Sequence, residues 1–530
     1  MSHDTPRRNF LRNLAATAAV TVPAAGAYGF ESDPTAAQAH GPLYNVVDFG
    51  AVADGKTLCT TAIQAAVDAC AKAGGGKVIV PPGKFLTSAI FLKSHVEVEV
   101  LGGARLLLNS DFKSTPPIQG RWEGIDRTTY AALFTGYDLE NVTITGRGVL
   151  DGQGEAWWKA FRQDRDLRRK LGLEEREPEN PPGSVLQWGR PRMINLFRCR
   201  DVRISGLTIV NSPSWNVHPV LCDNIVIDGL TITAPEDSPN TDGIDPDSCR
   251  NVRIANCYIS VGDDCIIIKS GYKYREDGRP SENITVTNCV FGTGHAGVGI
   301  GSETAGGVRE VAISNCVCEG TQRGLRFKTA RTRGNIVENV RASNVVMRNV
   351  GEAVVVTMFY NGGDLHKAEP VNQGTPRFRN FHFSDLLATN VKKAVVIEGL
   401  AEMPIEEVSV HNITVEGAAT AMTCTNAIGV RISDAVVSAA KGPTLSADTV
   451  RDLDVSGVTT RKPNGDALVR LENVKNAVLE SCSAPEGTST FLELKGAGNR
   501  GISLMGNRLG GAQEVSFKDG ASDSSIVKRS

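Results

Sequence analysis

The sequence has almost no net charge. Its 57 lysines and arginines nearly balance 59 aspartates and glutamates, which gives a formal net charge of −2 at pH 7. A chain with so small a net charge has no whole-molecule field to attract nucleic acid or an anionic membrane. We therefore expect no nucleic-acid partner, and an anionic substrate would have to be bound by a local group of positive side chains.

Zinc-type cysteine spacings are also missing. The 12 cysteines contain no Cys-x-x-Cys pair, and the closest two are Cys316 and Cys318. This excludes the common zinc-site patterns. We predict that most of the cysteines are small buried apolar residues, with one or two disulfides formed after export as the alternative. The sequence predicts no cofactor and no resident metal.

Apolar runs long enough to span a membrane are absent. The mild apolar stretch Leu14–Gly29 is short and rich in alanine. It follows the twin-arginine pattern around Arg7 and Arg8 and precedes the small-residue segment Ala37–Ala39. We predict a twin-arginine signal peptide over residues 1–39 and a periplasmic or secreted protein without membrane contact. The alternative is a chance basic start before a disordered tail.

A short repeat runs through most of the remaining chain. Cys199–Ile209, Cys222–Ile232 and Cys249–Ile259 resemble one another closely, and weaker copies continue to about residue 415. Each copy alternates Val or Ile with polar residues and is bounded by Asn, Asp or Gly, which is typical of short strands and turns. One such unit cannot bury its apolar face alone, so the units must stack. The repeat predicts an all-β, parallel β-helix, with the recurring asparagines forming a side-chain ladder.

Three segments depart from the repeat. A helical pattern over Cys59–Ala73 predicts a short N-terminal helix that caps the open end of the β-helix. Residues 152–192, which include Trp157 and Trp158, predict a helical excursion from one coil. From about Gly442 the repeat blurs, and we expect further coils and an irregular tail. We interpret residues 40–530 as a single domain.

The densest group of polar residues lies on three successive coils. Asp242, the pair Asp263 and Asp264, and His295 occur about one repeat apart, and residues one repeat apart stack at about 4.8 Å in a β-helix. Glycoside hydrolysis needs two carboxyl groups, one protonated and one ionised, and crowding of carboxylates raises a pKa. The chain must bend at Asp263 for both neighbouring aspartates to face one cleft. Turn aspartates or a calcium site remain the alternative.

Positive and aromatic residues follow on the next coils. Arg326 and Lys328 are two residues apart, so on a strand they point the same way and could bind a sugar carboxylate. Tyr360 could stack against a sugar, although a core position would also suit it. A solvated outer-face charge pair and an exposed loop histidine at His295 are the corresponding structural alternatives.

Four motifs in this order resemble glycoside hydrolase family 28, the polygalacturonases. They are Asn240-Thr241-Asp242, Gly262-Asp263-Asp264, Gly294-His295-Ala296-Gly297 and Arg326-Phe327-Lys328. The resemblance covers about residues 44–349 and implies a right-handed β-helix and an inverting, metal-free pectin hydrolase.

Carried over by position, the resemblance also implies a role for each site residue. Asp263 would be the general acid, Asp242 and Asp264 would activate water, and His295 would support them. The substrate would be bound by these candidates: Arg326, Lys328, Asn240, Lys269 and Tyr360. For such an inverting enzyme we expect the carboxyl oxygens of Asp263 to lie about 6.5–9.5 Å from those of Asp242 or Asp264.

The same resemblance leaves several functions open. The motif Gly294–Gly297 adds a methyl group where the family often has glycine, and the excursion at 152–192 could close one end of the cleft and favour exo cleavage. A rhamnogalacturonan hydrolase, a calcium-dependent pectate lyase and a non-catalytic glycan-binding β-helix are the alternatives. We expect a monomer whose partner is a pectic polysaccharide or oligogalacturonide.

Overall fold

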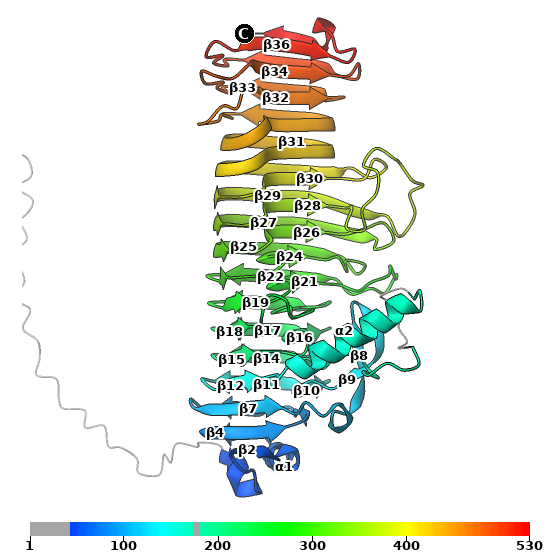
Figure 1. Cartoon of the computed structure of the whole chain (residues 1–530), viewed down its shortest axis with the longest axis vertical. Helices are drawn as coiled ribbons and strands as arrows, with labels where there is room; N and C mark the ends of the chain where they lie inside the picture. The colour runs from blue at the N-terminus through cyan, green and yellow to red at the C-terminus, as the bar shows by residue number, and fades with distance from the viewer. Residues whose placement is uncertain (1–42, 174–180, 530) are drawn as a thin grey trace, which may run out of the picture. The chain divides into compact units, whose positions relative to one another are not determined.

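The protein is a right-handed parallel β-helix in which three sheets run along one solenoid. The computed structural model describes residues 43–173 and 181–529, so the predicted signal peptide lies outside the described residues. Strands follow one another around each coil and pair with the equivalent strand one coil later, always in parallel apart from one hairpin. Figure 1 shows the coils stacked from β2 (Asp54–Leu58) near one end to β36 (Gln513–Lys518) near the other. The predicted fold is confirmed.

The first sheet is the longest of the three. Its strands are, in spatial order, β1 (Leu43–Asn45), β3 (Gly76–Val80), β6 (Val96–Val100), β11 (Glu140–Gly146), β14 (Arg200–Ser205), β17 (Asp223–Asp228), β19 (Arg250–Ala255), β22 (Ser281–Thr287), β25 (Val308–Glu319), β27 (Asn335–Arg348), β29 (Pro376–Thr389), β31 (Ile405–Ser456), β33 (Lys475–Glu480), β35 (Arg500–Met505) and β37 (Ile526–Arg529). β31 continues around more than one coil and also pairs with strands of the third sheet.

The second sheet contains shorter strands. They are β2, β4 (Gly83–Thr87), β7 (Ala104–Leu108), β12 (Val149–Asp151), β15 (Thr208–Val210), β18 (Thr231–Thr233), β20 (Tyr258–Ser260) and β23 (Val290–Phe291). β23 then pairs with the second half of β25, so this sheet merges with the first one at that coil.

The third sheet carries the polar motifs. Its strands are β5 (Ile90–Phe91), β10 (Phe134–Tyr137), β13 (Ile194–Phe197), β16 (Val217–Val220), β21 (Ile266–Ile268), β24 (Val298–Ile300), β26 (Arg323–Lys328), β28 (Glu352–Thr357), β30 (Lys393–Glu398), part of β31, β32 (Ala467–Glu472), β34 (Thr490–Lys495) and β36. Single bridges at Ile244 join β16 to β21, so the sheet is continuous through the coil that contains Asp242.

The core follows from the alternating pattern of the repeat. In β14, Val202 and Ile204 are buried while Arg203 between them is exposed. Ile204 lies beside Ile227, and Ile227 lies beside Ile254, so like aliphatic side chains stack from coil to coil. This stacking removes apolar area from water that a single coil would leave exposed.

The predicted asparagine ladder is present on the outside of the first sheet. Asn251 donates a side-chain hydrogen bond to Asn224 and accepts one from Asn283, each at 3.1 Å. All three residues have left-handed backbone conformations, with φ between 55° and 57°. Asparagine tolerates this conformation better than most residues, which explains why it recurs at the turn.

The cysteines behave as the sequence indicates. All 12 are buried and have free thiols in this structure, which confirms the interpretation of small buried residues. Cys199, Cys222 and Cys249 lie one coil apart, and the Cys199 N–H donates to the Cys222 Sγ at 3.3 Å.

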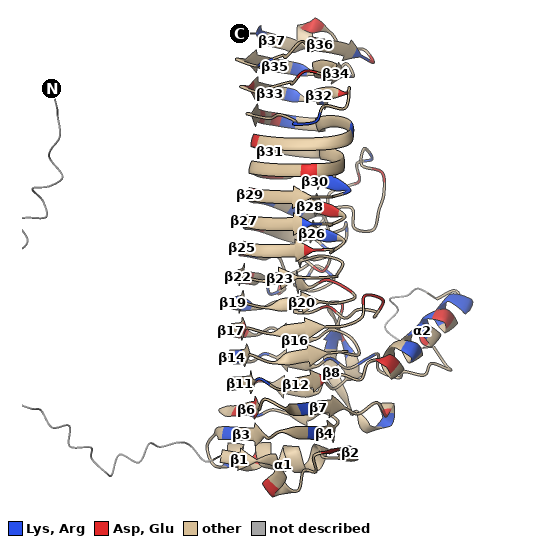
Figure 2. Cartoon of the chain, turned by 60° about the vertical axis from the view of Figure 1, so that its left-hand side comes forward, with Lys and Arg blue, Asp and Glu red and all other residues tan. Residues whose placement is uncertain are grey.

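Among the described residues, two α-helices lie outside the coils. The N-terminal helix α1 (Thr60–Lys72) buries its apolar face, formed by Ile63, Ala66, Val67 and Cys70, against the first coils and caps them as predicted. The excursion contains α2 (Glu155–Lys170), which confirms its helical character. Beside it, β8 (Pro117–Trp122) and β9 (Ile125–Tyr130) form the one antiparallel hairpin among the described residues. Figure 2 shows α2 carrying many charged residues.

The predicted irregular tail is wrong. Beyond residue 442 the strands β32 to β36 continue the coils in regular register, which confirms the expected further coils, and the register shifts only where β37 pairs with β35. The repeat blurs there because leucine and alanine, as in Leu453, Ala477 and Leu479, occupy interior positions that Val and Ile fill earlier. Within the described ranges, no helix has the length and apolar character needed to cross a membrane.

Candidate active site

The predicted site residues converge before successive strands of the third sheet. Asp263 and Asp264 precede β21, and His295 precedes β24. The His295 N–H donates to the Asp263 carbonyl at 2.9 Å, and the Gly243 N–H donates to the Asp264 carbonyl at 3.0 Å. These backbone bonds place Asp242, Asp263 and His295 on three adjacent coils, as the repeat predicts.

A bend at Gly262 lets both neighbouring aspartates face the site. A Cβ atom at this position would lie 2.1 Å from the Ser238 carbonyl oxygen, so only glycine fits. The Asp264 N–H then donates to Asp263 Oδ1 at 2.9 Å. Asp263 keeps 18% of its side chain exposed, against 4% for Asp264, so Asp263 is the carboxyl group that a substrate can reach.

The three carboxylates lie closer together than expected. One oxygen from each of Asp242, Asp263 and Asp264 lies within 4.8 Å of the others. The expectation of about 6.5–9.5 Å is therefore wrong for these oxygens. Two causes act together: Asp242 lies about one strand spacing, about 4.8 Å, from the next coil, and the bend at Gly262 turns the consecutive residues Asp263 and Asp264 toward the same side.

Lys328 and Arg326 hold Asp264 in its ionised form. Lys328 Nζ lies 2.8 Å from Asp264 Oδ2, and Arg326 approaches Asp264 Oδ1 at 4.0 Å. Burial by itself would raise the pKa of Asp264, but the charges of Lys328 and Arg326 outweigh it and lower this pKa to about 2.

Asp242 has the opposite environment. Burial and then the negative charge of Asp263 raise its pKa well above the usual value. Lys269 opposes this shift, with its Nζ 3.5 Å from Asp242 Oδ2 and 3.2 Å from Asp245 Oδ1. Asp245 is fully buried, and burial raises its pKa to about 7. At neutral pH the group of acids therefore retains a proton, which a glycoside hydrolase needs.

His295 contacts the most exposed aspartate. Its Nδ1 lies 2.8 Å from Asp263 Oδ1, and this hydrogen bond raises the pKa of His295. Asn240 approaches the other oxygen of Asp263, with Nδ2 3.4 Å from Oδ2. Both oxygens of Asp263 are thus held in position while its side chain stays accessible.

The remaining candidates divide into two kinds. Tyr360 lies beside the positive pair, its ring centroid 5.2 Å from Lys328 Nζ and 5.6 Å from Arg326 Cζ, where a sugar could contact all three. Lys269 is buried beneath the acids and lies 3.9 Å from the Trp215 ring centroid. This position suits a charge that organises Asp242 and Asp245 better than one that meets substrate.

Sequence reasoning missed four residues next to the site, Arg190, Trp215, Trp122 and Asp245. Arg190 is buried, donates to Asn240 Oδ1 at 2.6 Å and to the Pro213 and Pro239 carbonyls at 2.9 and 2.5 Å. Trp215 stacks on Trp122 of β8 with ring centroids 4.4 Å apart. Arg190 belongs to the excursion and Trp122 to the hairpin, so the repeat period carries no signal for either. Asp245 stood within the Asp242 motif and could have been singled out.

The acids could in principle hold a cation. Their three oxygens have a suitable mutual spacing, but Lys328, Lys269 and Arg326 already provide positive charge at 2.8, 3.5 and 4.0 Å from carboxylate oxygens. A metal ion would have to compete with these cations, since the site as built balances its own charge. The arrangement suits proton transfer and water activation.

Comparison with known proteins agrees with this geometry. Residues 182–437 match the model of glycosyl hydrolases family 28, and residues 43–123 match the rhamnogalacturonase A/epimerase, pectate lyase-like model. A probable polygalacturonase of Vitis vinifera is 37% identical over 73% of this chain and 77% of its own length. An endo-polygalacturonase of Pectobacterium carotovorum is 32% identical over 68% and 85%.

A solved structure extends the similarity to three dimensions. The hyperthermoactive exopolygalacturonase of Thermotoga maritima superimposes with a TM-score of 0.66 and 33% identity, over 75% of this chain and 91% of that one. The motifs, the coil arrangement and these relatives together show that the chain belongs to glycosyl hydrolases family 28.

Proposed function

We propose that the protein hydrolyses α-1,4-galacturonosyl linkages in polygalacturonate or pectin. One observation carries the proposal: three carboxylates within 4.8 Å of one another lie next to Arg326 and Lys328 in a family 28 β-helix. The acids suit glycoside cleavage, and the positive pair suits a sugar that bears a carboxylate. The names of the relatives, polygalacturonases among them, support this substrate.

Each carboxylate takes a separate role in this proposal. Asp263 donates a proton to the leaving oxygen, because it is the accessible member of the group. Asp264 accepts a proton from the attacking water, since its lowered pKa keeps it ionised, and Asp242 helps to orient that water. Asp242, whose pKa burial and the charge of Asp263 raise, lies within 4.8 Å of Asp263 and is the neighbour that can share a proton with it. Positive charge on His295 stabilises Asp263 after the proton has left.

Inversion at the anomeric carbon is part of the proposal. The closest oxygens lie nearer to the spacing of about 5–5.5 Å that retaining enzymes use. Asp264, however, is buried and held at 2.8 Å by Lys328, which suits a base and hinders attack on a sugar carbon. Proton NMR of the first product formed tests this step: the inverted anomer is expected, and the retained anomer would require a covalent intermediate.

Exo cleavage is favoured by the β8–β9 hairpin, which lies at one side of the candidate active site. On the third sheet, the side chains of Asn195, His218 and Asp245 are fully buried. Trp122 of that hairpin stacks on Trp215, and Arg121 pairs with Asp247 at 3.3 Å. A polysaccharide therefore meets a wall on this side. Release of small uronides from the start of the reaction is expected, whereas a broad mixture of oligomers would indicate endo cleavage.

The decisive experiment compares two polymers in the presence of a chelator. We expect reducing ends to be released from polygalacturonate and not from rhamnogalacturonan, with activity unchanged by the chelator. Activity only on rhamnogalacturonan would reassign the substrate. A calcium-dependent, ultraviolet-absorbing product would indicate a lyase, and binding without new reducing ends would indicate a glycan-binding protein.

We further propose export by the twin-arginine route and action as a monomer without cofactor. The Arg7-Arg8 pattern supports the route. Replacing both arginines by lysine should leave the protein in the cytoplasm, and normal export of that variant would contradict the assignment.

A further inference from the structure

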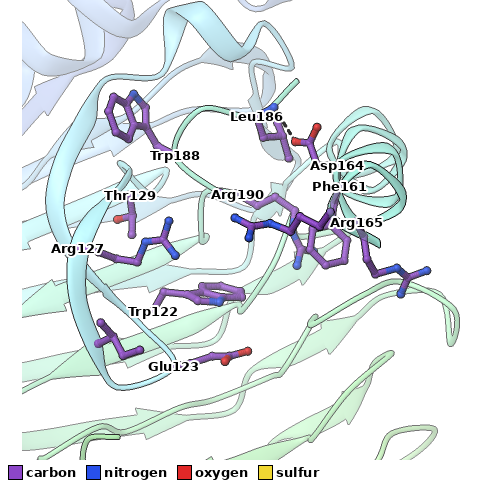
Figure 3. Close-up of a pocket in the computed structure, with 13 residues that line it drawn as sticks. Trp122, Glu123, Arg127, Thr129, Phe161, Asp164, Arg165, Leu186, Trp188 and Arg190 are labelled. Carbon is purple, nitrogen blue, oxygen red and sulfur yellow. Dashed lines mark hydrogen bonds between the residues drawn. The ribbon is translucent and has the colours of Figure 1, made fainter. Parts of the chain in front are cut away.

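A cavity lies beside the candidate active site, between the hairpin, α2 and residues 186–190. Its volume is about 100 Å³, and one water-sized group needs about 10–15 Å³ by the same measure, so it offers room on the order of one sugar unit. The aromatic walls are Trp122, Phe161 and Trp188. Figure 3 shows Trp122, Arg127 and Arg190 around the same space.

The cavity carries an excess of positive charge. Four arginines and two acids line it. One of the acids, Asp164, is occupied by the backbone N–H groups of Val185 and Leu186, at 2.6 and 2.8 Å. The side chain of Arg127 forms no hydrogen bond or ion pair with any residue in the described part of the chain. Burial and the charge of Arg168 lower the pKa of Arg127, and the charge of Glu123 opposes them only in part. An anion bound at Arg127 would relieve both effects.

A hydrogen-bonded path joins this cavity to the proposed acid. Arg190 forms part of the cavity wall, and its guanidinium lies 3.8 Å from the Phe161 ring centroid. Arg190 donates to Asn240 Oδ1 at 2.6 Å, and Asn240 Nδ2 lies 3.4 Å from Asp263 Oδ2. Two residues, Arg190 and Asn240, therefore separate the cavity from the carboxyl group that a substrate reaches.

We propose that this cavity is a second carboxylate-binding subsite, which takes a galacturonate unit other than the one held by Arg326 and Lys328. The proposal rests on the polygalacturonate function argued above. Trp122 and Trp188 would contact the apolar face of the sugar ring, while Arg127 binds its carboxylate. The chemistry selects a ligand with both an apolar ring face and a negative charge, which describes a uronate and not a neutral hexose.

The test is a binding measurement that does not depend on turnover. Asp263→Asn abolishes the proposed proton donor, so trigalacturonate can be titrated calorimetrically without hydrolysis. Adding Arg127→Ala should weaken binding about tenfold, as expected for loss of one charge-assisted hydrogen bond at a partly exposed site. Arg169→Ala is the matched control, because this α2 arginine is 73% exposed, pairs with Asp166 and does not line the cavity.

Further variants keep the result interpretable. Arg127→Lys should recover part of the affinity and Trp188→Ala should lower it, with thermal unfolding recorded for each protein. Equal affinities for the Arg127→Ala and Arg169→Ala proteins, or an unaltered affinity after Trp188→Ala, would overturn the proposal. The failure of wild-type protein to cleave polygalacturonate would instead refute the proposed function, so the two failures are distinguishable.

Discussion

Two groups of charged residues on the third sheet use the same coil stacking with opposite results. Near the C-terminus, Glu493 of β34 lies in register with Arg470 of β32 and pairs with it, and it also pairs with Lys518, which lies two residues beyond the register position on β36. Burial alone would raise the pKa of Glu493, but these two partners lower it. In the candidate active site, acids occupy neighbouring coils, and burial together with Asp263 raises the pKa of Asp242.

The difference lies in the order of charges along the stack. An alternating order pairs every charge with an opposite one and stabilises the ionised form of the acid. Placing acids on adjacent coils concentrates negative charge about one strand spacing apart, and one member then retains a proton. The β-helix thus provides a regular spacing, and the choice of residues at that spacing decides between a structural ion pair and a proton donor.

The largest expected effect is on kcat, and it should appear in the active-site group of acids and not in the group around Glu493. Asp263→Asn should lower kcat by roughly 10²–10⁴, because it removes the proposed proton donor. Glu493→Gln on the alternating stack should leave kcat unchanged and affect only stability. Initial rates of reducing-end release, with thermal unfolding of both variants, measure this contrast. Comparable losses of kcat in both proteins would remove the distinction.

The next effect concerns the buried ion pair of the site. Lys328→Ala leaves Asp264 buried without its partner at 2.8 Å and should reduce the free energy of unfolding by about 3–5 kcal/mol. Arg470→Ala, whose side chain is 29% exposed, should cost no more than about 1 kcal/mol. Urea unfolding of both variants at pH 7 gives the two values, and equal costs would show that burial does not distinguish the pairs.

The destabilisation caused by Lys328→Ala should depend on pH in a definite direction. The pKa of Asp264 is lowered from 3.8 to about 2 in the folded protein, so its contribution to stability is present above pH 3.8. That contribution is lost as the pH falls through about 2. The destabilisation by Lys328→Ala should therefore shrink between these two pH values, and a constant cost would contradict the assignment.

A smaller effect concerns the charge on His295. Because its pKa is raised by Asp263, His295 is positively charged below that pKa and neutral above it. The ratio of kcat/KM between wild type and His295→Gln should be about tenfold at low pH and fall toward one as the pH rises. Parallel pH profiles of the two proteins would show that the charge of His295 has no part in the reaction.

The smallest expected effect is on the asparagine ladder, away from both charged groups. Asn251→Gly removes two side-chain hydrogen bonds but suits the left-handed backbone, so it should cost about 1 kcal/mol of stability and no activity. Asn251→Ala should cost about 1–2 kcal/mol more, because alanine is strained at φ 56°. Identical stabilities of the Gly and Ala variants would contradict this account.

The sequence predicts the positions of residues that recur once per coil. It does not predict the positions of residues in segments that leave the coils. Val202 and Ile204 reveal their strand because their period repeats, and Asp242, Asp263 and His295 come together because they lie about one repeat apart. Arg190 and Trp122 reach the site from an excursion and a hairpin, whose return to the β-helix depends on tertiary packing. The predicted separation of the carboxylates is wrong because a rule for two opposed acids does not describe Asp242 stacked on a coil that carries two consecutive aspartates.

The burial of all the cysteine side chains has a consequence for how the protein responds to oxidants. All 12 cysteines are enclosed in the folded protein, and none is cross-linked. Oxidants reach thiols through solvent, so the folded molecule offers them little to react with. The melting temperature should then be the same with and without a reducing agent, because noncovalent stacking would carry the stability.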